Sequence, residues 1–100
     1  MKVQFTASAL RRLQQIRDYY RKNGNPTKGG KITKQVFKQS NLLKDNPYMG
    51  QEEEYLKPLK QGHRYLLVDK MYKLIYLVAK PIIYITDVFD TRQDHDKMKP

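Results

Sequence analysis

The last third of the chain, residues 63–94, constrains the fold more than any other stretch. It contains three apolar runs that are rich in β-branched and aromatic residues, and each has the length of a strand: Arg64–Val68, Tyr72–Ala79 and Ile82–Phe89. The breaks between the runs, 69–71 and 80–81, are short enough for hairpins. The sequence therefore predicts three consecutive antiparallel strands. Both faces of the middle strand are largely apolar, so each face should be covered at least in part.

The residues before this block predict a short strand and two helices. Lys2–Phe5 alternates polar and apolar residues, as a strand does, and Thr6 is a good helix N-cap. A helix should run from Ala7 to about Lys22, because apolar residues recur there at helical spacing: Leu10, Leu13, Ile16 and Tyr20. A second helix should begin near Thr27 and end before 45–47, with an apolar stripe made of Ile32, Val36, Phe37 and Leu43.

These elements predict one α+β domain over residues 1–100, in which a helical hairpin packs on one face of an antiparallel sheet completed by the C-terminal meander. The pattern leaves open whether the first strand pairs in the middle of the sheet or at an edge. In the connection, 47–62, Glu52–Glu54 should form a solvated loop tip or pair with basic residues across the surface. Apolar residues should pin this loop to the core: Tyr55, Leu56 and Leu59. Within the polar tail, 91–100, residues 95–100 should be frayed or form a mobile functional end.

The charge distribution favours an anionic partner. Lys and Arg total 20 against 10 Asp and Glu, which gives a formal net charge of +10. The first 50 residues hold 11 basic and 2 acidic residues, whereas the last 50 hold 9 and 8. Such a field attracts nucleic acid, the ribosome or an acidic protein segment. There is no cysteine, no membrane-length apolar run and no signal-peptide pattern, so we expect a cytoplasmic protein that does not bind membranes.

The chemistry-bearing residues are few. The two histidines have no metal-site spacing, and neither a phosphate-binding glycine loop nor a serine-nucleophile motif is present, so we expect no cofactor or metal. Three cations mark the predicted strands: Arg64, Lys73 and Arg92. If they converged over one face they could hold a phosphate, and His95 could act as acid or base in metal-free RNA cleavage. In the competing interpretation, Lys73 extends to an edge and Arg92 pairs with Asp90 or Asp94.

The chain resembles the RelE/ParE superfamily of bacterial toxins along its whole length. The resemblance is carried by VQFTASALRRLQQIRDYY, LLKDNPYMGQEEEYL and, above all, YKLIYLVAKPIIYITDVFDTRQD. It implies the same α+β fold, growth arrest by the free toxin, and an antitoxin that covers the toxin in a hetero-oligomer. RelE-like members cut ribosome-bound messenger RNA without metal, whereas ParE-like members inhibit DNA gyrase.

The resemblance also implies which residues would carry RelE-type catalysis. Arg64 and Arg92 match two of its cations, and Lys73 replaces an arginine. Leu66 occupies the position of another cation, and Met98 stands where a tail tyrosine is expected, with His95 nearby but out of register. The set is half present, and the ending FDTRQD is common in ParE-like sequences. We therefore expect a ParE-like toxin that inhibits gyrase, with RelE-like cleavage of messenger RNA by Arg64, Lys73, Arg92 and His95 as the alternative.

Overall fold

The structure, a computed structural model, describes all 100 residues, and its centre is a five-stranded sheet of order β1-β5-β4-β3-β2. The strands are β1 (Lys2–Phe5), β2 (Gln51–Glu52), β3 (Arg64–Val68), β4 (Tyr72–Ala79) and β5 (Ile82–Asp90). The helices are α1 (Ala7–Lys22) and α2 (Pro26–Leu42), and two 3₁₀ helices, η1 (Glu54–Leu59) and η2 (His95–Lys97), complete the chain. The α+β fold and the antiparallel meander β3-β4-β5 are confirmed.

The first strand, β1, pairs at an edge of the sheet, a point that the sequence pattern left open. β1 lies parallel to β5, with Val3 opposite Ile83 and Phe5 opposite Ile85, so the sheet is mixed rather than wholly antiparallel. The chain leaves β1 directly into α1, because the Thr6 hydroxyl accepts a hydrogen bond from the Ala9 amide at 3.1 Å as an N-cap. The predicted bounds of α1 are confirmed.

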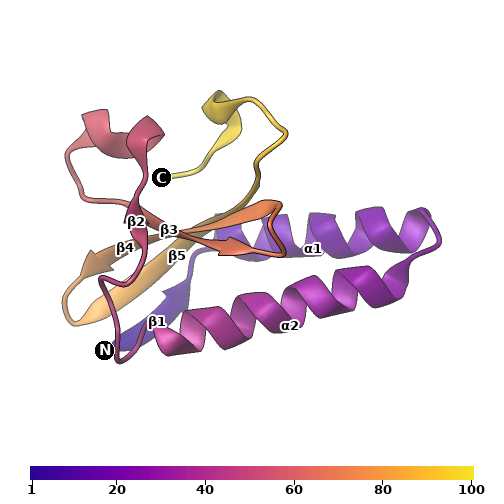
Figure 1. Cartoon of the computed structure of the whole chain (residues 1–100), viewed down its shortest axis with the longest axis horizontal. Helices are drawn as coiled ribbons and strands as arrows, with labels where there is room; N and C mark the ends of the chain where they lie inside the picture. The colour runs from indigo at the N-terminus through magenta and orange to yellow at the C-terminus, as the bar shows by residue number, and fades with distance from the viewer.

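The two helices cover one face of the sheet, as Figure 1 shows. Their buried residues and those of the strands form a core cluster of 14 buried residues, which includes Leu13, Ile32 and Leu74. The helices approach closely at Gly29, where an added Cβ would lie 3.3 Å from both Arg17 Cα and Tyr20 Cβ. Helix α2 begins at Pro26, one residue before the expected start, because Asn25 caps it and proline suits the first helical position.

For two residues of the predicted apolar stripes, Leu10 and Phe37, the prediction of burial is wrong. Leu10 is 51% exposed and Phe37 is 46% exposed. In α1 the buried arc is centred on Ala9, Leu13 and Ile16, which places Leu10 off to its side. Phe37 instead packs against Phe5 at the rim of the core, with ring centroids 5.1 Å apart.

The opposite face of the sheet is also covered, by η1 and the C-terminal segment (Figure 1). Leu56 of η1 and Met98 of the tail pack with Ile75 and Phe89 in a second, smaller cluster. The C-terminal segment is therefore packed rather than frayed, since Met98 is only 4% exposed, while a mobile functional role of this end stays a prediction. In the connecting loop, Leu56 is the anchor, while the other two expected anchors, Tyr55 and Leu59, are exposed.

A β-bulge in β5 sets up this second layer. Ile75 pairs with Asp87 and Tyr76 pairs with Ile85, so Thr86 is the extra residue. Ile85 and Val88 both face the helices, which leaves Thr86 and Asp87 together on the other side. The bulge lies just past the end of β1. There the side chains of Thr86 and Asp87 can bind the C-terminal tail.

Candidate functional site

A cleft between α1 and the end of β5 combines apolar and charged walls. It has a volume of about 340 Å³. We call it the α1–β5 cleft, and it is lined by Arg12, Gln15, Ile16, Tyr19, Tyr72, Val88, Phe89, Asp90, Arg92 and Gln93. Because α1 begins where β1 ends, the helix crosses the part of β5 that extends beyond its pairing with β1, and the hollow lies between them.

Arg92 forms one charged wall of the cleft. Its Nε donates to Asp90 Oδ1 at 3.0 Å, and its Nη2 donates to Asp90 Oδ2 at 2.8 Å. This bidentate hydrogen bonding raises the pKa of Arg92 and lowers the pKa of Asp90. This ion pair is the one that the sequence offers as the alternative to phosphate binding by Arg92. The Arg92 side chain is still 58% exposed.

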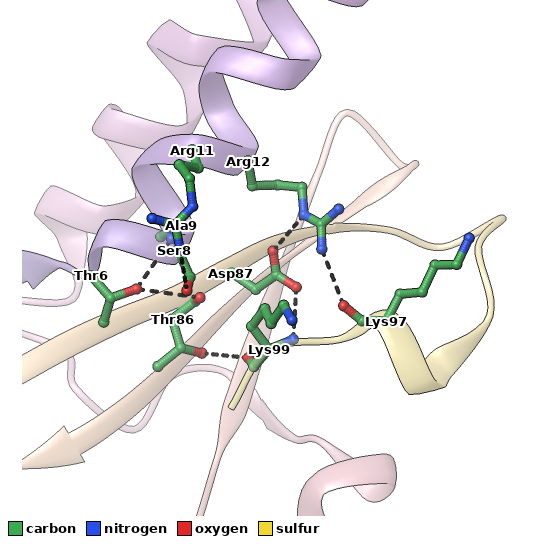
Figure 2. A network of polar contacts seen from close by, with 9 residues as sticks. All are labelled: Thr6, Ser8, Ala9, Arg11, Arg12, Thr86, Asp87, Lys97 and Lys99. Atoms are coloured by element: carbon green, nitrogen blue, oxygen red, sulfur yellow. Dashed lines mark hydrogen bonds and ion pairs between the residues drawn. The ribbon is translucent and has the colours of Figure 1, made fainter.

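Arg12 forms the second charged wall and joins it to the tail, as Figure 2 shows. Its Nε donates to the fully buried carboxylate of Asp87 at 2.9 Å, and its Nη2 donates to the Lys97 carbonyl at 3.1 Å. The other Asp87 oxygen accepts from the Lys99 amide at 3.0 Å, and the Thr86 hydroxyl donates to the Lys99 carbonyl at 3.0 Å. The polar pair created by the bulge therefore holds the tail in place.

The cleft floor is apolar and firmly supported. Ile16 and Val88 belong to the main core, and the Tyr72 hydroxyl lies 3.2 Å from that of Tyr20. Burial is the main reason that the pKa of Tyr72 is raised. Tyr19 stands at the rim and is 54% exposed. Arginine and tyrosine around an apolar floor are the residue types that dominate protein-binding hot spots.

Arg64 and Lys73 lie on opposite faces of the sheet. Arg64 has the same strand parity as Leu66 and Val68, which face the helices, and its Nη1 donates to the Gly50 carbonyl at 2.8 Å. Lys73 pairs with Phe89 in the β4–β5 ladder and so faces η1. Its Nζ lies 2.7 Å from Glu53 Oε1 and 4.3 Å from the ring centroid of Tyr65.

Glu53 differs from the prediction for its segment. The sequence predicts a solvated loop tip here, yet Glu53 is only 3% exposed. Its second oxygen accepts from the Tyr55 amide at 2.9 Å and so caps η1. Glu53 is buried because η1 folds over the outer face of β4, which brings the carboxylate to Lys73. Of the expected alternatives, pairing with a basic residue holds for this glutamate, and the pair is largely buried.

His95 lies on the same face as Lys73. Its ring centroid is 5.4 Å from that of Tyr55 and 6.2 Å from that of Phe89. The structure thus brings His95 and Lys73 to one face, Arg64 to the other, and Arg92 to the α1–β5 cleft. No single position for a phosphate is shared by the three cations, and catalysis by this set stays a prediction.

The sequence reasoning did not select Arg12, Asp87 or Glu53. Asp87 offered a signal, since a charged residue in the middle of the apolar run IIYITDVF needs a buried partner. Arg12 offered none, because it is one of four arginines on an amphipathic helix and only the tertiary structure selects it.

This arrangement defines a small basic α+β domain with a cleft between α1 and β5 that is lined by two arginines and apolar residues. The sequence model of the family described as "ParE toxin of type II toxin-antitoxin system, parDE" matches residues 3–95, so the chain belongs to the ParE toxin family. No curated protein matches it. Among solved structures it is similar to a chain of the "Chromosomal ParDE TA system from P. aeruginosa", with 22% identity, a TM-score of 0.73, and coverage of 90% of this chain and 95% of that one. That likeness supports the fold.

Proposed function

We propose that this chain, a type II toxin by family, arrests growth in the cytoplasm by binding and inhibiting DNA gyrase, and that a cognate antitoxin neutralises it. The proposal follows from the ParE-like resemblance of the whole chain. The observation that carries it is the dispersal of the cations that the RNA-cleaving alternative requires. Lys73 is engaged by Glu53 on one face of the sheet, while Arg64 is engaged by the Gly50 carbonyl on the other.

The α1–β5 cleft supports a binding mechanism rather than a chemical one. The Nη1 groups of Arg12 and Arg92 have no hydrogen-bond partner within the chain, so each arginine can still donate a hydrogen bond to a carboxylate of another protein. The apolar floor between them gives such a partner area to bury. We propose this cleft as the surface that contacts the target.

A supercoiling assay with purified gyrase, relaxed plasmid and the full-length chain tests the proposal. We expect the chain to inhibit supercoiling, and Arg92→Glu to lose most of the inhibition, because it reverses a charge at the cleft. Lys97→Glu is the matched control, since it makes the same charge change on an exposed side chain outside the cleft. Uninhibited supercoiling at high toxin excess would reject gyrase as the target.

The RNA-cleaving alternative has its own test. Primer extension on messenger RNA from translating ribosomes would reveal cuts in phase with codons. We expect none above background in the presence of the chain. Codon-phased cuts that disappear with Arg92→Ala would replace the gyrase proposal with RelE-like cleavage.

A further inference from the structure

The outer face of α2 carries an unusual concentration of positive charge. Lys31, Lys34 and Lys38 are all exposed, and we call them the lysine ridge. An α-helix turns about 100° per residue. On that geometry the ridge points directly away from the buried residues of the helix, which are Gly29, Ile32, Val36 and Ser40. The ridge therefore faces solvent along about 10 Å of the helix, from its rise of about 1.5 Å per residue.

These charges are not neutralised within the protein. None of the three lysines takes part in an ion pair, and α2 contains no Asp or Glu. Lys31 also borders a polar hollow of about 350 Å³ at the start of α2, which Asn25, Thr27 and Lys28 help to line.

The composition of this face indicates which class of anion it fits. Lysine is depleted in protein–protein interfaces, where aromatic residues and arginine provide most of the binding energy. Apart from the lysines, the positions of α2 that point most directly away from the core hold Thr27 and Asn41. Phe37 and Leu42, each 46% exposed, lie on either side of the ridge, and the Phe37 ring packs against Phe5, so the ridge itself offers single-stranded bases no row of rings to stack on. A row of flexible ammonium groups instead suits a regular array of phosphates.

We propose that the lysine ridge binds the phosphodiester backbone of double-stranded DNA without reading its sequence. This surface lies on the outside of the helical hairpin, separate from the α1–β5 cleft, since the two share no residue. The proposal does not depend on the target of the toxin. If the target is a DNA-bound enzyme, the ridge would raise the local concentration of the toxin on the substrate of that enzyme.

Fluorescence anisotropy with a labelled 20-base-pair duplex and the full-length chain, measured from 50 to 200 mM salt, tests the proposal. Each phosphate contact contributes about −0.9 to the slope of log K against log salt, so three ridge contacts should contribute about −2.7. We expect Lys31→Gln/Lys34→Gln/Lys38→Gln to lose that part of the slope and to bind at least tenfold more weakly at 50 mM salt, as expected for a surface that supplies most of the contacts.

The control variant Lys57→Gln/Lys60→Gln/Lys97→Gln removes the same charge from η1, the residue after it and η2, on the opposite side of the sheet. We expect it to change affinity less than threefold. Equal loss in both variants would show that net charge and not the ridge binds DNA, and would overturn the proposal. So would tighter binding of a single strand of the same length, or equally tight binding of polyglutamate. Circular dichroism melting of each variant verifies that it is folded.

Discussion

The two faces of the sheet are covered in different ways. On the helix side, α1 and α2 bury a cluster of 14 residues, whereas η1 and the tail bury a cluster of four on the other side. The smaller layer holds two ion pairs in which the carboxylate is buried and the cation partly exposed, Arg12–Asp87 at its edge and Lys73–Glu53 beneath η1. The helix side is thus held by apolar area, and the tail side depends on a few polar contacts.

This difference predicts how the two sides of the sheet contribute to the stability of the fold. Burial of apolar area contributes about 25 cal/mol per Å², so the helix side should determine global unfolding. A thin layer anchored by two apolar side chains and by polar pairs can open locally while the rest stays folded. The comparison makes predictions that differ in both size and extent.

The largest effect is expected on the helix side. Leu74 is fully buried between the sheet and the helices, and Leu74→Ala should lower the free energy of unfolding by about 3 kcal/mol, since it removes apolar contacts and leaves a cavity. Urea denaturation followed by circular dichroism measures this. Leu67→Ala, on an exposed side chain of the neighbouring strand, is the control and should change stability by less than about 0.5 kcal/mol. Similar losses in the two variants would contradict the description of the core.

The next effect concerns the buried carboxylate that joins α1 to the tail. Asp87→Ala removes the partner of Arg12 and of the Lys99 amide, and should cost about 2 kcal/mol; Arg12 is partly exposed and can be rehydrated, which keeps the loss below that for a fully buried pair. Thermal and urea unfolding measure the loss. Asp94→Ala, which removes an exposed carboxylate nearby, should have little effect. An unchanged Asp87→Ala protein would mean that the network contributes nothing.

Met98→Ala should be less costly and local. The tail can detach rather than keep a cavity, so we expect a global loss of about 1 kcal/mol or less. The sharper readout is hydrogen exchange at the Lys99 amide, which should become faster because this amide donates to Asp87. Amides of α1 and α2 should keep their protection, and Lys97→Ala serves as the control. Loss of protection throughout the sheet would contradict the local opening.

The smallest effect is a pH dependence centred on His63. Its side chain is buried, neither ring nitrogen has a hydrogen-bond partner, and burial lowers its pKa. The unfolded state therefore binds this proton more readily, and the contribution of His63 to stability falls as pH drops below about 6.5 towards the lowered folded pKa. The slope from one group is at most about 1.4 kcal/mol per pH unit.

Unfolding measured between pH 7.5 and 5.5 tests this prediction by comparison of variants. His63→Phe should flatten the pH dependence relative to the unmodified chain, whereas His95→Gln, on an exposed ring, should keep it. A pH dependence that His63→Phe leaves unchanged would show that other groups cause it.

The sequence predicted much of the helix side because periodicity reports on apolar faces. Strands β3 and β4 and helix α1 follow the predicted bounds, and the spacing of Leu13, Ile16 and Tyr20 identified the buried arc. The second layer was not predictable in this way. Met98 is a single apolar residue in a polar tail, and Glu53 lies in a run of three glutamates, so neither belongs to a repeating pattern.

The residues of the candidate site likewise include some that the sequence could identify and some that it could not. Arg92 could be chosen from the sequence, because it follows the last strand and matches a family position. Arg12 could not, since its role depends on α1 crossing the end of β5 beyond β1. Nor could the sequence show that Arg64 and Lys73 face opposite sides, because this requires the register of β3 against β4.

The sequence by itself determined the order of the elements, the meander, the hairpin of helices and the basic character of the first half, since these follow from local periodicity and composition. The tertiary structure alone decided the parallel edge pairing of β1, the bulge at Thr86, and the burial of Asp87 and Glu53. The physical reason is that a buried charge is tolerated only beside its partner, and here the partners of Asp87 and Glu53 lie 75 and 20 residues away along the chain.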